Sequence, residues 1–120
     1  MRSLACALAL AASAPASVSA SPPTSLGMPD KPAAFEATLK AGDIHEECMK
    51  VEGGKTRRYE WTSDVRVDFN IHFHRGKDVH YPVTRDGAKK ESGNFTAPST
   101  EEYCWMWTAK EAAKIRGTFR

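Results

Sequence analysis

The sequence has few histidines and cysteines, four and three in 120 residues, and it has no excess charge of one sign. Its net charge of +2 is too small to predict binding to nucleic acid or to a membrane surface. After the first residues, no apolar run approaches the ~20 residues that a membrane-spanning helix needs. Phosphate-binding loops, nucleophile elbows and zinc-protease helix motifs are also absent. We therefore expect no enzymatic activity.

The N-terminal residues have the features of a secretory signal peptide. Arg2 supplies a positive charge, residues 4–14 are apolar, and small residues lead up to Ala20. Cleavage after residue 20 predicts an exported protein, either periplasmic or secreted. Residues 21–42 contain four prolines and are expected to form a flexible lead-in. With 41% hydrophobic and 27% charged residues, the remainder, 43–120, has the composition of one globular domain.

Export also predicts the state of the cysteines. Removal of the signal peptide takes away Cys6 and leaves Cys48 and Cys104. In an oxidising compartment such a pair normally forms a disulfide, which would stabilise the fold by roughly 3–5 kcal/mol. The alternative is two free thiols used for metal binding or redox chemistry, although their spacing is unlike the CxxC motif.

The clearest structural signal is the segment 65–83, VRVDFNIHFHRGKDVHYPV. Its first half alternates apolar and polar side chains without exception. A period of two over this length predicts a half-buried β-strand, because successive side chains point to opposite faces. The side chains expected to face the core are Val65, Val67, Phe69, Ile71 and Phe73.

Residues 76–78, Gly-Lys-Asp, predict a turn into a second strand of a hairpin. A three-residue loop would pair Arg75 with Val79, which matches the apolar sets of the two strands. In that register the inner face would receive Val79, Tyr81 and Val83. Pro82 lacks an amide donor, so this second strand is expected at an edge of the sheet.

The same register predicts a group of histidines on the outer face. His74 would lie opposite His80, with His72 beside them. Three imidazoles on one face suggest a metal site for Zn²⁺ or Cu²⁺. The alternative is a solvated polar face without a ligand. His45 is isolated near a strand start and is expected to be exposed.

The rest of the chain predicts further short strands. They are expected at residues 44–51, 56–62, around Phe95, 102–108 and 115–120, with turns at 63–64 and within 84–92. Residues 35–40 fit either a helical turn or an edge strand, and the helix-prone residues 109–114 are too few for a stable helix. The aromatic run at 103–107 is expected to pack in the core. Together these elements predict an all-β fold, a compact antiparallel β-sandwich of about six to eight strands with one disulfide.

The order of these features resembles the GOLD domain, a Golgi-dynamics lumenal module of cargo receptors and some lipid-transfer proteins. The resemblance covers residues 43–120 and is carried by ECMKVEGG around Cys48, the 67–83 hairpin, Gly93 and Phe95, and YCWMWT from Tyr103. It implies a β-sandwich with a Cys48–Cys104 disulfide, and Tyr103 and Trp107 as the aromatic residues of that strand. The family's cysteine usually lies nearer to Met106.

Two functions remain open at this point. The resemblance implies an exported, non-enzymatic binding module with a protein partner. The histidines suggest instead a periplasmic Zn- or Cu-binding protein that uses His72, His74 and His80. An enzyme is a third alternative, and it would require a preformed pocket with convergent polar groups.

Overall fold

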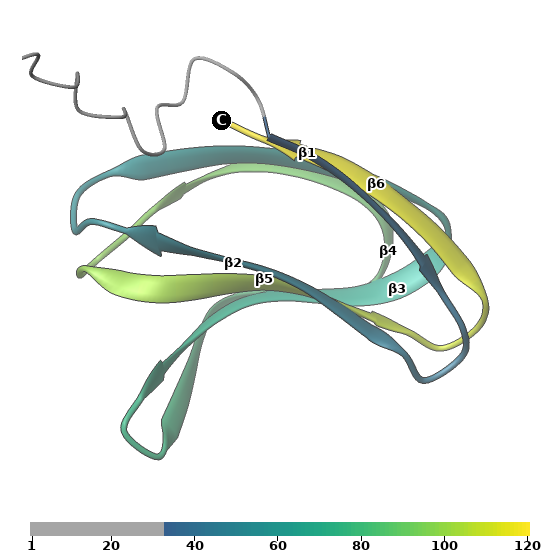
Figure 1. The fold of residues 1–120 in the computed structure, drawn as a ribbon, viewed down its shortest axis with the longest axis horizontal. Helices are drawn as coiled ribbons and strands as arrows, with labels where there is room; N and C mark the ends of the chain where they lie inside the picture. The colour runs from purple at the N-terminus through teal and green to yellow at the C-terminus, as the bar shows by residue number, and fades with distance from the viewer. Residues whose placement is uncertain (1–32) are drawn as a thin grey trace, which may run out of the picture.

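Six antiparallel β-strands make up the fold, shown in Figure 1 as a computed structural model that describes residues 33–120. They are β1 (Ala33–Leu39), β2 (Ile44–Val51), β3 (Thr56–Arg75), β4 (Asp78–Thr96), β5 (Glu101–Ala109) and β6 (Ala113–Phe119). The predicted all-β class and strand number are confirmed. This part of the chain contains no helix that could span a membrane. The predicted signal peptide and residues 21–32 of the lead-in lie outside the described residues.

All six strands belong to a single sheet that curls over itself (Figure 1). The strand order is β1-β6-β3-β5-β2, and β4 pairs with β3. The first half of β3 pairs with β6, and its second half pairs with β5. The long strand β3 therefore passes through both halves of the sheet, and its curvature lets these halves pack against each other as a sandwich.

An aromatic core fills the space between the two halves. Trp107 of β5 meets Trp61 of β3 edge to face, with ring centroids 6.1 Å apart. Trp105 meets Phe119 of β6 in the same way at 5.3 Å. All three tryptophans are at most 1% exposed, which confirms that this aromatic strand packs in the core. Of the predicted inward residues of β3, Val67, Phe69, Ile71 and Phe73 are buried and Val65 is partly buried.

The turn predicted at residues 63–64 is wrong, because β3 continues through it. Asp64 Oδ1 accepts a hydrogen bond from the Lys114 amide at 2.8 Å, so its polar side chain is satisfied across strands without a turn. In place of a turn, the pairing of β3 with β4 has an irregularity between Thr62 and Val67. Bulges of this kind bend a strand and increase its twist without ending it.

The polar residues 84–92 also lie within a strand, β4, and not in the expected loop. Gly87 has φ +64°, a conformation that glycine adopts without strain. Its amide donates to Asp68 Oδ1 on β3 at 2.9 Å. Glycine at a pairing irregularity can therefore keep β4 continuous where its composition suggested a break.

Strand β1 (Ala33–Leu39) lies ahead of the domain boundary expected at residue 43, within the segment expected to be a flexible lead-in. β1 pairs along its whole length with β6, so the edge-strand alternative for residues 35–40 is the correct one. Phe35 packs on Trp107 with ring centroids 4.7 Å apart, and Leu39 is buried. The alternation of Phe35, Ala37 and Leu39 was too short to stand out behind a proline-rich segment.

Candidate functional site

The predicted disulfide between Cys48 and Cys104 is present and joins β2 to β5, with an S–S distance of 2.08 Å. The two residues are direct partners in the antiparallel register, so both side chains project from the outer face of the sheet. Cys48 is exposed, whereas Cys104 is 6% exposed. One sulfur of the bridge is therefore accessible to solvent, and the other is covered.

His72 of β3 continues the same row across the sheet, because it is the register partner of Cys104. It lies on the outer face, yet it is only 4% exposed and is the one buried polar side chain of the described residues. The rings of His74 and Tyr81 lie 5.2 Å and 5.7 Å from its ring. Neighbouring side chains therefore enclose an imidazole on a face where the sequence predicted solvent.

One hydrogen bond fixes the tautomer of His72. Its Nδ1 lies 2.8 Å from Oδ1 of Asn70, the residue two positions earlier on the same face. Because a carbonyl oxygen can only accept, Nδ1 carries the proton and Nε2 keeps its lone pair. Burial lowers the pKa of His72 below 6.5; the Glu46 carboxylate opposes this shift, and His74 adds to it. At neutral pH the imidazole is therefore neutral, with Nε2 free to accept or to bind a cation.

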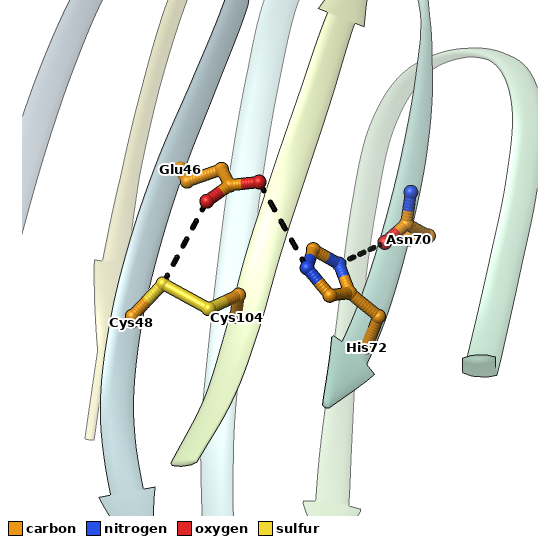
Figure 2. Close-up of a disulfide and its surroundings, with 5 residues drawn as sticks. All are labelled: Glu46, Cys48, Asn70, His72 and Cys104. Atoms are coloured by element: carbon orange, nitrogen blue, oxygen red, sulfur yellow. Dashed lines mark hydrogen bonds and ion pairs between the residues drawn. A yellow bond between two sulfur atoms is a disulfide. The ribbon is translucent and has the colours of Figure 1, made fainter. Parts of the chain in front are cut away.

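Glu46 of β2 completes the cluster (Figure 2). Its carboxylate lies between the imidazole and the disulfide: Oε1 is 3.8 Å from His72 Nε2, and Oε2 is 3.9 Å from Cys48 Sγ. A disulfide sulfur carries no proton, and 3.8 Å exceeds hydrogen-bond distance. A carboxylate and an imidazole lone pair thus face each other with no proton between them, which is the arrangement that a cation would bridge. We call Glu46, Cys48, His72 and Cys104 the outer cluster.

The three predicted histidines are not brought together. His80 is the register partner of Phe73, and the two rings stack with centroids 4.9 Å apart. Phe73 faces the core side and packs on Tyr103, so His80 lies on the face opposite to His72 and His74. The placement of His80 opposite His74 is wrong. Only His72 and His74 of the predicted set are neighbours.

The error comes from the length of the hairpin loop. Arg75 pairs with Asp78, so the loop has two residues and not three. Gly76 at φ +62° followed by Lys77 at negative φ fits a II′ turn, the preferred form for such loops. A shift of one residue moves every side chain of the strand to the other face.

A bulge then restores the register further from the loop. Ile71 pairs with Val83 and Phe73 with His80, so Tyr81 and Pro82 both lie opposite His72. Proline is tolerated at a bulge on an edge strand because no amide donor is required there. The edge position predicted for this strand is confirmed, since β4 pairs only with β3 among the described strands.

This register leaves apolar side chains exposed near the end of the β3–β4 hairpin. Val79 is 38% exposed and Tyr81 is 55% exposed, although both were predicted to face the core. In Figure 1 the end of this hairpin projects away from the rest of the sheet. The one other large hydrophobic residue this exposed within 33–120 is Ile44, at the start of β2.

Two residues of the site region were missed or misjudged from the sequence. Glu46 received no role, although its position two residues before Cys48 on a strand places both on one face. His45 was expected to be exposed, but it stacks on Phe35 at 5.6 Å and lies 2.9 Å from Glu47 Oε1. His45 directly precedes Glu46 on β2 and packs on Phe35 and Trp107, so it lies on the opposite face and not in the outer cluster.

Comparisons with known proteins define the fold and little more. No known protein family and no curated protein matches the sequence. The pre-peptidase C-terminal domain of a collagenase from Bacillus anthracis is similar in structure, with a TM-score of 0.56 and 12% identity over 74% of this chain and 89% of that chain. PliG from Aeromonas hydrophila, a periplasmic inhibitor of g-type lysozyme, has a TM-score of 0.50 and 12% identity over 74% of this chain and 86% of that chain.

At such identities the similarity concerns the fold alone. Neither structure is described as a GOLD domain, so the resemblance to that family stays a prediction. Both similarities extend over most of the other protein's length. The curled antiparallel sheet is therefore an arrangement that also occurs in other bacterial proteins, one of them periplasmic.

Proposed function

We propose that this chain is an exported, non-enzymatic binding module that attaches to a protein partner through the projecting end of its β3–β4 hairpin. The observation that carries the proposal is the exposure of Val79 and Tyr81 on that hairpin. A protein normally buries large apolar side chains of a strand, and adjacent exposed ones near a projecting end mark an interaction site. Tyrosine is also among the residues that contribute most at protein interfaces.

The hairpin is built to present these side chains rigidly. The Arg75 guanidinium lies 5.4 Å from the ring centroid of Phe73 and binds Glu101 at 2.7 Å. The ring of His80 on β4 stacks on the ring of Phe73, with centroids 4.9 Å apart. A rigid element loses little conformational entropy on binding, which favours affinity. Pro82 and the bulge interrupt the free edge of β4, so side chains and not added backbone pairing would form the contact.

Export and a binding role are supported by separate observations. The disulfide requires an oxidising compartment to persist, and the N-terminal sequence has signal-peptide features. The similar fold of PliG is that of a periplasmic inhibitor of g-type lysozyme. The resemblance to the GOLD domain also implies binding and not catalysis.

Site-specific photo-crosslinking tests the proposal. A photoreactive amino acid would replace Tyr81 in one variant and the exposed Thr38 of β1 in a control, each expressed with its signal peptide in an exporting bacterial host. We expect the Tyr81 variant alone to yield a crosslinked protein from the exported fraction. When Val79→Ser is added to the variant with the photoreactive residue at position 81, the yield of crosslinked protein should fall severalfold. Equal crosslinking from both positions, or none from Tyr81, would count against the hairpin as the binding site.

The alternative function, a Zn- or Cu-binding protein, would need ligands other than the three histidines predicted from the sequence. His80 cannot join His72 and His74 in this geometry. A metal role would therefore have to use groups that lie near His72 on β2 and β5.

A further inference from the structure

We propose that reduction of the Cys48–Cys104 disulfide converts the outer cluster into a Zn²⁺ site formed by both thiolates, Nε2 of His72 and the carboxylate of Glu46. This inference does not depend on the hairpin as a docking surface. It rests on a group of ligand atoms from three adjacent strands. A ring nitrogen of His72, a carboxylate oxygen of Glu46 and Sγ of Cys104 all lie within 4.8 Å of one another.

The ligand types suit zinc. Structural zinc sites are tetrahedral and use two to four cysteines, completed by histidines where fewer than four are present, and carboxylate oxygens also bind Zn²⁺ in proteins. In such a site neighbouring ligand atoms are about 3–4 Å apart, so the observed separations require only small side-chain movements. The contacts of Glu46 Oε1 with His72 Nε2 at 3.8 Å and of Oε2 with Cys48 Sγ at 3.9 Å place the carboxylate beside both other ligand types.

The imidazole is already oriented as a metal ligand. Nδ1 of His72 donates to Oδ1 of Asn70, which leaves the Nε2 lone pair directed at Glu46 (Figure 2). Metal-binding histidines almost always donate their other nitrogen in this way, which fixes both the tautomer and the ring orientation. His72 as a whole is only 4% exposed, so neighbouring side chains hold the imidazole in place beside Glu46.

The sheet keeps the two sulfurs together after reduction. Cys48 and Cys104 are direct register partners on β2 and β5, and the backbone pairing extends on both sides of them. Their side chains must therefore leave the same face at the same point. Zn²⁺ would replace the covalent S–S bond as the link between the strands.

Reduction requires a dithiol, either a small molecule or a thiol–disulfide exchange protein. One thiolate of the dithiol attacks the exposed Sγ of Cys48, which forms a mixed disulfide and releases Cys104 as a thiolate. The second thiol then attacks the sulfur of the dithiol in that mixed disulfide, so the dithiol leaves oxidised and Cys48 becomes a thiolate. Two electrons pass to the protein, Zn²⁺ binds both thiolates, and the two protons of the dithiol go to water.

Cobalt titration of the purified exported protein tests the site. The protein would be reduced anaerobically, freed of reductant and titrated with Co²⁺, a spectroscopic substitute for Zn²⁺. We expect one equivalent to give the visible bands of tetrahedral Co²⁺ and a thiolate charge-transfer band, both removed by Zn²⁺. The oxidised protein should give neither. Absence of these bands from the reduced protein would overturn the proposal.

Variants distinguish a Zn²⁺ site formed by the folded sheet from Zn²⁺ binding by the two free thiolates alone. His72→Gln should weaken Zn²⁺ binding by about tenfold or more, and Asn70→Ala by about tenfold. His74→Gln, whose ring adjoins that of His72, should bind within about twofold of the unmodified protein. Glu46→Gln should weaken binding, while Glu102→Gln, a carboxylate on the other side of the disulfide, should not. If His72→Gln binds as tightly as the unmodified protein, the site is not the one proposed.

The disulfide potential gives an independent measurement. Because Zn²⁺ binds the reduced form alone, the midpoint potential of the disulfide should rise once free Zn²⁺ exceeds its Kd. Each further tenfold increase in free Zn²⁺ should raise this potential by about 30 mV. The measurement uses thiol redox buffers with free Zn²⁺ held constant by a metal buffer. His72→Gln should show the rise only at correspondingly higher free Zn²⁺. A potential that does not change with Zn²⁺ would refute the proposal.

Discussion

His72 and Cys104 face each other across β3 and β5, and both are buried on the outer face of the sheet, where His72 was expected to meet water. The imidazole is held by Asn70 through Nδ1, and its Nε2 faces Glu46 at 3.8 Å. This relationship gives the region two properties that can be measured. The protonation of His72 is linked to folding, and the disulfide beside it is linked to stability.

The stability of the protein should fall as the pH decreases through about 6.5. Burial lowers the pKa of His72 in the folded chain, so the unfolded chain binds this proton more readily. Stability is then lost between the unfolded pKa of 6.5 and the lower folded value, and it levels off below the folded value. Urea unfolding midpoints measured from about pH 7.5 to about pH 5.5 check this, because histidines are the main groups that titrate in that range.

The matched variants for this measurement are His72→Gln and His74→Gln. Glutamine at position 72 cannot take up the proton, so this part of the pH dependence should disappear. The exposed His74 should be replaceable with most of the dependence retained. A His72→Gln protein that loses stability on acidification as steeply as the unmodified protein would show that another group is responsible.

Removal of the disulfide by the double substitution Cys48→Ala/Cys104→Ala should lower the free energy of unfolding by about 4 kcal/mol, as the loop-entropy model gives for a bridge of this span. The double change leaves no unpaired thiol beside His72. Urea unfolding of the oxidised protein and the variant at neutral pH provides the comparison. A difference below about 1 kcal/mol would mean that the sheet holds β2 and β5 together without the bridge.

Gly117 on β6 should not tolerate a larger residue. A Cβ at this position would overlap the ring of Phe35 and would lie 2.7 Å from the backbone carbonyl oxygen of Glu60. The carbonyl belongs to β3 and cannot move without disturbing its strand pairing. We expect Gly117→Ala to cost about 1–3 kcal/mol of unfolding free energy.

The exposed neighbour Thr118 provides the control for that substitution. Thr118→Ala should change the unfolding free energy by less than about 0.5 kcal/mol. If the two variants unfold at the same urea concentration, the ring of Phe35 and the β3 backbone at Glu60 must both be able to move enough to admit the methyl group.

The sequence was informative for two strands in which one face is fully apolar. The alternation at 65–73 and the aromatic run at 103–107 are each dictated by burial, and both are found as expected. The cysteine pair was also predictable, because export leaves only two. These signals can be found without knowing how strands pair, since each depends on residues within one strand or on the number of cysteines in the exported chain.

The outer cluster was not predictable for the opposite reason. Its members lie on three strands, so their meeting depends on the register between those strands and on no local pattern. The hairpin shows how sensitive this is: a loop of two residues and not three moved His80 away from His72, and the bulge at Pro82 brought Tyr81 beside it. Neither the loop length nor the bulge is determined by the apolar pattern of the two strands.

Tyr59 should remain protonated to a higher pH than an ordinary tyrosine. Burial, together with the carboxylate of Glu91, raises the pKa of Tyr59 to about 12, an effect opposed by Arg85. The hydroxyl contacts Glu91 Oε1 at 3.4 Å. In the unfolded chain the group titrates near 10.0, so stability should fall as the pH rises from about 10 towards about 12.

Two readouts test this assignment. Tyrosinate absorbance that appears near pH 12 in the folded protein should be missing from Tyr59→Phe but present in Tyr81→Phe, which changes an exposed ring. Tyr59→Phe should also lose less stability than the unmodified protein over the same alkaline range, because phenylalanine has no proton to release. Parallel losses in the two proteins would mean that the Tyr59 hydroxyl ionises as easily in the folded chain as in the unfolded one.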